Sequence, residues 1–254
     1  MERPIVTERT ELTGIPLLHI RPRNLQGPAP TVLFFHGWSS NKENQVITAE
    51  ALACEGYRVI VPDSIHHGER GALPKYDNAA AARYFWPTIF HTITEADTLA
   101  NAVVAAGWTD PERIGVSGHS MGGFIAAGVT ARYDWVKVTV LHNGCPCYVW
   151  ADEHFRRAAN ALAPTREQAA RLQPYDPEQF IERIAPRPIL FLHGSVDVVV
   201  PPQGARRFVE LARPYYEAHP ERLAIMEWER LNHYVTTTMI EEMRRWFCRY
   251  LPRT

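Results

Sequence analysis

Short, almost continuously apolar runs alternate along this chain with segments long enough to form helices. A strand that is apolar along its whole length is covered on both faces, whereas a one-sided sheet shows strict alternation of apolar and polar residues. Strands that alternate with helices pair in parallel. The sequence therefore predicts an α/β fold with a mostly parallel sheet and helices on both faces, its strands covering residues 32–35, 57–61, 113–117, 136–141, 189–192 and 223–228.

The remaining segments fit around such a sheet. Residues 5–12 and 15–20 flank Thr13-Gly14, and this pattern predicts a hairpin at an antiparallel edge of the sheet. Residues 88–107 carry an apolar stripe at helical spacing and end on a glycine, so they are expected to form a helix. The last helix is expected over residues 234–251.

Residues 148–184 interrupt the alternation, because they are rich in alanine and arginine and are broken by three prolines. We interpret them as a small helical insert, either a partial cap over a site or a surface excursion without such a role. The 254-residue chain contains no linker, so residues 1–254 are expected to form a single domain.

Charge and cysteine content exclude several classes of partner. Lysine and arginine total 27 against 28 acidic residues, so no basic field exists to attract nucleic acid. Residues 1–10 lack the apolar core of a signal peptide, and no run of about 18 apolar residues occurs, which predicts a cytoplasmic protein without a membrane partner. The four cysteines match neither a redox nor a zinc pattern, so reduced thiols and no metal are expected.

The sequence from Gly118 to Gly123 reads Gly-His-Ser-Met-Gly-Gly and lies between a predicted strand and a helix-like run, 124–131. A G-x-S-x-G turn in this setting holds its serine in a strained conformation, and glycines are needed because neighbouring side chains would collide. An ordinary glycine turn before a helix gives the same letters. The strand before it, the helix after it and the partners described next favour Ser120 as a nucleophile.

A serine hydroxyl needs a base to take its proton and a carboxylate to orient that base. In hydrolases with this turn the acid follows the serine and the histidine comes last, each after a later strand. Asp197 follows the strand 189–192, and His233 is the histidine that follows the strand 223–228. These residues are the predicted acid and base, although an aspartate that caps a turn and a surface histidine would look similar.

Acyl transfer also needs two backbone donors aimed at the developing oxyanion. The amide of Met121, directly after the serine, is one predicted donor. The amide of Trp38, in the loop after the strand 32–35, is the other. Aromatic residues near strand ends or in the insert are candidates for the substrate pocket, and core packing explains each equally well: Trp38, Trp86, Tyr148, Trp150 and Phe155.

Residues 62–71 contain His66 and His67 beside acidic residues, a composition that raises the question of a metal site. The spacing is not that of a zinc motif and no third ligand is marked. We expect a structural or pocket-lining loop, held by a contact between Asp63 and Arg70 or by a histidine hydrogen bond.

These motifs together resemble the α/β-hydrolase superfamily, and in particular its branch of small serine esterases related to dienelactone hydrolase and prolyl oligopeptidase. The resemblance covers nearly the whole chain and implies a sheet of about eight strands and hydrolysis through an acyl-enzyme, without metal or organic cofactor. Dienelactone hydrolases often carry a cysteine nucleophile where Ser120 stands here, and oligopeptidases have a large additional domain.

The expected activity is therefore hydrolysis of small to medium carboxylic esters. The same residues cleave amides, so a small peptidase or amidase is the alternative enzyme. A catalytically silent binding protein is a third possibility, which the presence of every triad member disfavours. The sequence leaves the oligomeric state open.

Overall fold

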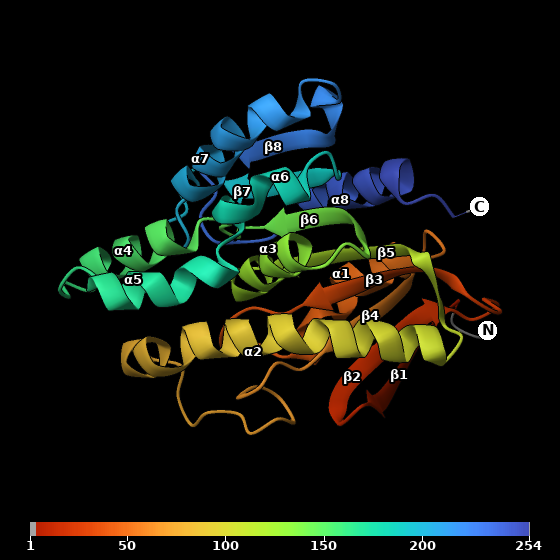
Figure 1. The fold of residues 1–254 in the computed structure, drawn as a ribbon. Helices are drawn as coiled ribbons and strands as arrows, with labels where there is room; N and C mark the ends of the chain where they lie inside the picture. The colour runs from red at the N-terminus through yellow and green to blue at the C-terminus, as the bar shows by residue number, and fades with distance from the viewer. Residues whose placement is uncertain (1–3, 254) are drawn as a thin grey trace.

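The computed structural model describes residues 4–253 and shows a twisted sheet of eight strands, ordered β1-β2-β4-β3-β5-β6-β7-β8 (Figure 1). The predicted hairpin is present, since β1 and β2 pair antiparallel, and β2 also runs antiparallel to β4. All other neighbours are parallel. The predicted α/β-hydrolase fold is thereby confirmed, with the strands β1 (Ile5–Leu12), β2 (Ile15–Pro22), β3 (Ala29–Phe35), β4 (Arg58–Pro62), β5 (Thr109–His119), β6 (Val136–His142), β7 (Ile189–Gly194) and β8 (Leu223–Trp228).

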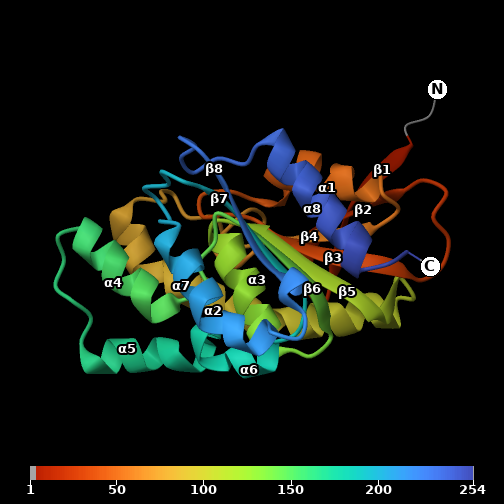
Figure 2. The ribbon, with the colours of Figure 1, turned by 90° about the horizontal axis from the view of Figure 1, so that it is seen from above.

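Helices cover both faces of this sheet (Figure 2). On one face α1 and α8 bury their apolar side chains against the strands, and on the other α2, α3 and α7 do so. This two-sided cover explains why β3, β4 and β7 are buried along their whole length. The helices are α1 (Val46–Ala53), α2 (Asn78–Ala105), α3 (Met121–Arg132), α4 (Tyr148–Ala158), α5 (Arg166–Leu172), α6 (Ile181–Ile184), α7 (Gln203–Ala212) and α8 (Thr237–Tyr250).

Two helix boundaries differ from the sequence prediction. Helix α2 begins at Asn78 rather than at residue 88, because the Asp77 side chain caps its first turn through the amide of Ala80 (2.9 Å) and the helix continues past Pro87. Helix α8 begins at Thr237 rather than at residue 234, because Thr236 caps it. No helix among residues 4–253 is long and apolar enough to cross a membrane.

The segment 148–184 is helical, as the sequence predicts, and contains α4, α5 and α6 with short 3₁₀ turns. Its middle helix begins with a capping box formed by Thr165 and Gln168. Figure 1 shows α4 and α5 at the end of the molecule where α2 begins. Contact between these parts is direct, because the rings of Phe85 and Phe155 lie 5.8 Å apart, edge to face.

Candidate active site

The turn between β5 and α3 holds Ser120 in a backbone conformation that residues other than glycine rarely adopt, with φ 56° and ψ −120°. Close packing fixes this turn. A Cβ at Gly118 would lie 2.2 Å from the carbonyl oxygen of Gly122, and one at Gly122 would lie 2.0 Å from the carbonyl oxygen of Phe35. The Ser120 amide donates to the carbonyl of His142 on β6 (2.9 Å). The predicted strained turn is therefore what the structure contains.

The loops after β7 and β8 bring Asp197 and His233 into contact, with 2.7 Å between Nδ1 of the imidazole and Oδ2 of the carboxylate. The carboxylate is fully buried, whereas 16% of the histidine side chain is exposed. A carboxylate in this position accepts the Nδ1 proton and leaves Nε2 free to act as a base. The structure thus joins two residues that are 36 positions apart in the sequence.

Several donors keep Asp197 ionised. Burial alone raises the pKa of this carboxyl group, but hydrogen bonds from His193 and His233 hold the pKa well below its ordinary value. The second oxygen accepts from the amides of Val199 and Val200, each at 2.9 Å. The side chain is therefore a carboxylate at neutral pH and is fixed at both oxygens.

Two asparagines that the sequence analysis missed connect these loops. The side-chain oxygen of Asn232 accepts from the amides of Val198 (3.0 Å) and His233 (2.9 Å), so it links the two loops. Asn143, after β6, donates to the carbonyl of Tyr234 and accepts from the amide of Gly194. Two sequence features could have identified these asparagines: Asn232 stands directly before His233, and Asn143 directly follows a predicted strand.

His119, which precedes the serine, lies against His233, with 5.0 Å between the ring centroids. Its Nε2 atom is buried and has no hydrogen-bond partner within the described part of the chain. Burial, and next the proximity of His233, lowers the pKa of His119 to about 3, so its ring is neutral at physiological pH.

The loop after β3 approaches the serine closely. A Cβ built on Gly37 would lie 3.4 Å from the Cβ of Ser120, which places the neighbouring Trp38 beside the turn. His36 fixes this loop, because its Nε2 accepts from the amide of Ser64 (3.0 Å) and its Nδ1 lies 2.9 Å from the carbonyl oxygen of Gly37. Burial lowers the pKa of His36 and favours this neutral form.

A buried ion pair stabilises the same region. The Lys42 ammonium donates to Asp63 (2.6 Å) and to Glu69 (2.5 Å). The predicted contact between Asp63 and Arg70 is present, because the Arg70 guanidinium donates to the backbone carbonyl of Asp63 (3.2 Å) while it also pairs with Glu95. No pattern in the polar run around Lys42 predicted that this lysine would be buried.

The histidines of the loop 62–71 do not form a group with other side chains that could bind a metal ion, within the described residues. His67 bonds to the carbonyl of Ile65 and packs against Trp38. Within residues 4–253, no three histidine, cysteine or acidic side chains form a group suited to a metal ion. The loop therefore packs against Trp38 through His67.

Aromatic side chains from three helices and from the loop after β3 gather next to the serine turn. Trp38 contacts Phe85, and Phe85 contacts Trp86, Phe124 and Phe155. We call these five residues the aromatic cluster. Of the other candidates from the sequence, Tyr148 is fully buried with its hydroxyl on the carbonyl of Phe124, and Trp150 stacks on His154.

The prolyl oligopeptidase family matches residues 91–251, a region that includes the serine turn and both later loops. The chain belongs to this family. It is therefore an enzyme of the serine hydrolase class, and the predicted relationship to prolyl oligopeptidases is confirmed.

Relatives of similar length share most of the chain. It is 34% identical to "Putative esterase YitV" of Bacillus subtilis, with 97% of this chain and 100% of that protein aligned. It is 30% identical to "Esterase YjfP" of Escherichia coli, again with 97% of this chain and 100% of that protein aligned. The crystal structure of TT1662 from Thermus thermophilus shares the fold, with a TM-score of 0.78. The two sequences are 23% identical, and the match covers 98% of this chain and 99% of TT1662.

Proposed function

We propose that this protein hydrolyses carboxylic esters of small to medium size through an acyl-enzyme, with Ser120 as nucleophile, His233 as base and Asp197 as the group that orients the base. The contact of 2.7 Å between His233 and Asp197, beside the strained serine turn, is the observation on which the proposal rests. The relatives named as esterases favour esters as the substrate class.

In the first step Nε2 of His233 takes the proton of the Ser120 hydroxyl while its oxygen attacks the ester carbonyl. The buried Asp197 carboxylate stabilises the imidazolium that forms. The amides of Met121 and Trp38 are the proposed donors to the oxyanion. Because both are backbone groups, one at the serine turn and one in the loop that His36 holds, they need little reorganisation as charge develops.

Collapse of this intermediate breaks the bond between the acyl carbon and the alcohol oxygen, and His233 returns the proton to the alcohol. A water molecule then attacks the acyl group on Ser120 with the same histidine as base. The acid is released and the serine hydroxyl is restored. No step requires a metal ion or an organic cofactor.

Hydrolysis of p-nitrophenyl acetate and butyrate tests the proposal. We expect turnover by the natural protein and a loss of roughly two to six decades in kcat for Ser120→Ala. A fluorophosphonate probe should label the natural protein and the control variant Ser195→Ala, but not Ser120→Ala. Full activity in Ser120→Ala would refute the assignment of the nucleophile.

A peptidase or amidase is the second candidate, and the name of the family favours it. The triad does not discriminate between esters and amides, because the pocket selects the substrate. Aminoacyl naphthylamides separate the two activities. Faster turnover of these amides than of the butyrate ester would make the peptidase the better description.

We also propose that residues 1–254 act as one domain in the cytoplasm and that the insert 148–184 partly caps the site. Four free cysteines are consistent with a reducing compartment. Phe155 of α4 lies 6.1 Å from the ring of Phe124 on α3, which supports a role in covering the acyl group. Phe155→Ala should raise KM for long or aromatic acyl esters more than for acetates. Cell fractionation tests the proposed cytoplasmic location.

A further inference from the structure

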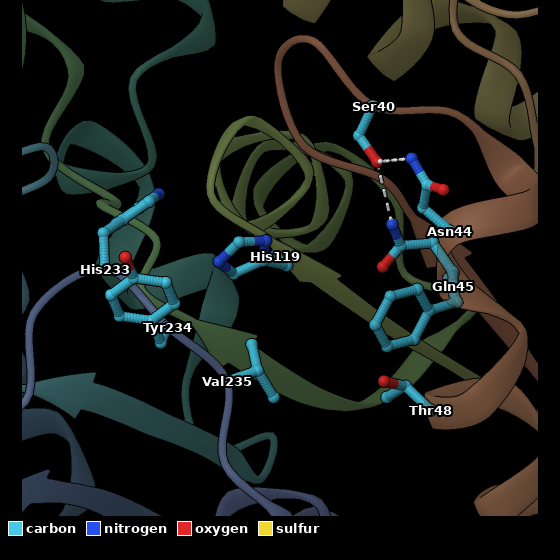
Figure 3. Close-up of a pocket in the computed structure, with 9 residues that line it drawn as sticks. Ser40, Asn44, Gln45, Thr48, His119, His233, Tyr234 and Val235 are labelled. Carbon is cyan, nitrogen blue, oxygen red and sulfur yellow. Dashed lines mark hydrogen bonds between the residues drawn. The ribbon is translucent and has the colours of Figure 1, made fainter.

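A cavity of about 280 Å³ lies beside His233, between the loop that carries this residue and the start of α1 (Figure 3). The aromatic cluster takes no part in its lining. The residues that line it are Phe34, Ser40, Asn44, Gln45, Thr48, His119, His233, Tyr234 and Val235.

One side of the cavity presents neutral polar groups. The hydroxyl of Ser40 accepts hydrogen bonds from the side-chain amides of Asn44 (3.3 Å) and Gln45 (3.1 Å). Figure 3 shows the side-chain oxygens of Gln45 and Thr48 turned toward the cavity. Among the described residues that line it there is no lysine, arginine, aspartate or glutamate, so this side suits hydroxyl groups better than carboxylates or phosphates.

The opposite side is formed by His119 and His233. His119 contributes to this side, whereas its buried Nε2 is out of reach of solvent. A neutral imidazole offers one donor and one acceptor. Because Nδ1 of His233 donates to Asp197, its Nε2 remains as an acceptor for a hydroxyl group.

The position of the base identifies which part of an ester enters this cavity. His233 has to protonate the departing alcohol oxygen, so that oxygen must come within hydrogen-bond reach of its ring. The alcohol part therefore leaves along the side of the site that His233 lines, whereas the aromatic cluster, which includes Trp38, lies outside the lining of this cavity.

We propose that this cavity is the alcohol subsite and that the preferred alcohol is a small neutral polyol, such as a glycerol or a monosaccharide unit. The inference deepens the proposed ester hydrolase function and depends on it. In the reaction the polyol oxygen loses its bond to the acyl carbon and gains the proton that His233 took from Ser120, so a neutral polyol is released.

Two esters with the same acyl group and different alcohols test the proposal, with butyrate release followed by titration at constant pH. We expect kcat/KM for glycerol monobutyrate to exceed that for ethyl butyrate by about tenfold or more. Equal values, or preference for ethyl butyrate, would overturn this inference alone. Absence of turnover with both esters, together with no fluorophosphonate labelling, would overturn the proposed function as well.

The variant Thr48→Val removes one hydroxyl from the cavity and keeps the shape of the side chain. We expect it to lower the ratio of kcat/KM for the two esters by roughly three- to tenfold. Thr10→Val, the same change on the exposed edge strand β1, is the matched control and should leave the ratio unchanged. An unchanged ratio in Thr48→Val would contradict the assignment of the subsite.

Discussion

The serine turn and the acid-base loops reach their geometry in different ways. The turn from Gly118 to Gly122 is compact and fixed by backbone atoms that leave no room for a side chain. The loops that carry Asp197 and His233 are held by side-chain hydrogen bonds, above all those of Asn232. The first region is thus specified by sterics over a few residues, and the second by polar contacts between distant ones.

This difference predicts different kinds of sensitivity. Added atoms should damage the serine turn, because its neighbours are rigid backbone groups. Lost hydrogen-bonding atoms should damage the acid-base loops, because they leave buried donors without partners. The two regions also respond differently to acid, since one rests on neutral buried histidines and the other on an ionised carboxylate.

Asp197→Asn should have the largest effect on activity. Asparagine can still accept from the amides of Val199 and Val200, so folding should persist, but it no longer stabilises the His233 cation. We expect kcat for p-nitrophenyl butyrate to fall by about four decades. Loss of less than about one decade would show that another group orients the histidine.

Gly122→Ala tests the serine turn. The added methyl group would lie 2.0 Å from the carbonyl oxygen of Phe35, so the turn has to move. We expect kcat to fall by at least about a hundredfold, because a displacement on the order of 1 Å misaligns the nucleophile.

Gly107→Ala is the control for this variant. Gly107 has φ 69° and open space around it, so alanine there costs stability without approaching Ser120. Thermal unfolding of both variants separates the loss of stability from the loss of activity. Activity in Gly122→Ala equal to that in Gly107→Ala would show that the turn tolerates movement.

Asn232→Ala tests the acid-base loops. It leaves the amides of Val198 and His233 without their acceptor. We expect kcat to fall by roughly 10- to 100-fold, with the labelling of Ser120 slowed in proportion. Asn101→Ala on the exposed face of α2 is the control, and an equal effect in both variants would remove the proposed role.

The smallest effect concerns pH and belongs to the serine turn. Burial lowers the pKa of His142 to about 4 in the folded protein, against about 6.5 when unfolded. The unfolded chain therefore binds the proton first as pH falls through 6.5, and the folded state loses stability until pH reaches about 4.

Between pH 7 and 5.5 this residue should lower the free energy of unfolding by about 1 kcal/mol. Urea denaturation at the two pH values measures the difference. His142→Asn should reduce the difference by about that amount, whatever its effect on stability at pH 7. A difference as large as in the natural protein would show that His142 is not responsible.

Much of the fold followed from local patterns. The apolar runs identified each parallel strand and the hairpin, because their period and their turn residues are properties of adjacent positions. The start of α2 was missed because the predicted helix began only after Pro87, whereas contacts of Phe85 and Trp86 with Phe124 favour a continuous helix.

The sequence by itself determined the sheet, the strained Ser120 turn and the order in which Asp197 and His233 follow it, since strand and turn patterns arise from neighbouring residues. Only the tertiary structure decided that Lys42 is buried against Asp63, that Asn232 links two loops and that polar side chains of residues 40–48 face His233 across a cavity. Such contacts join residues far apart in the chain, and their energies depend on burial and on distances between atoms that no local pattern encodes.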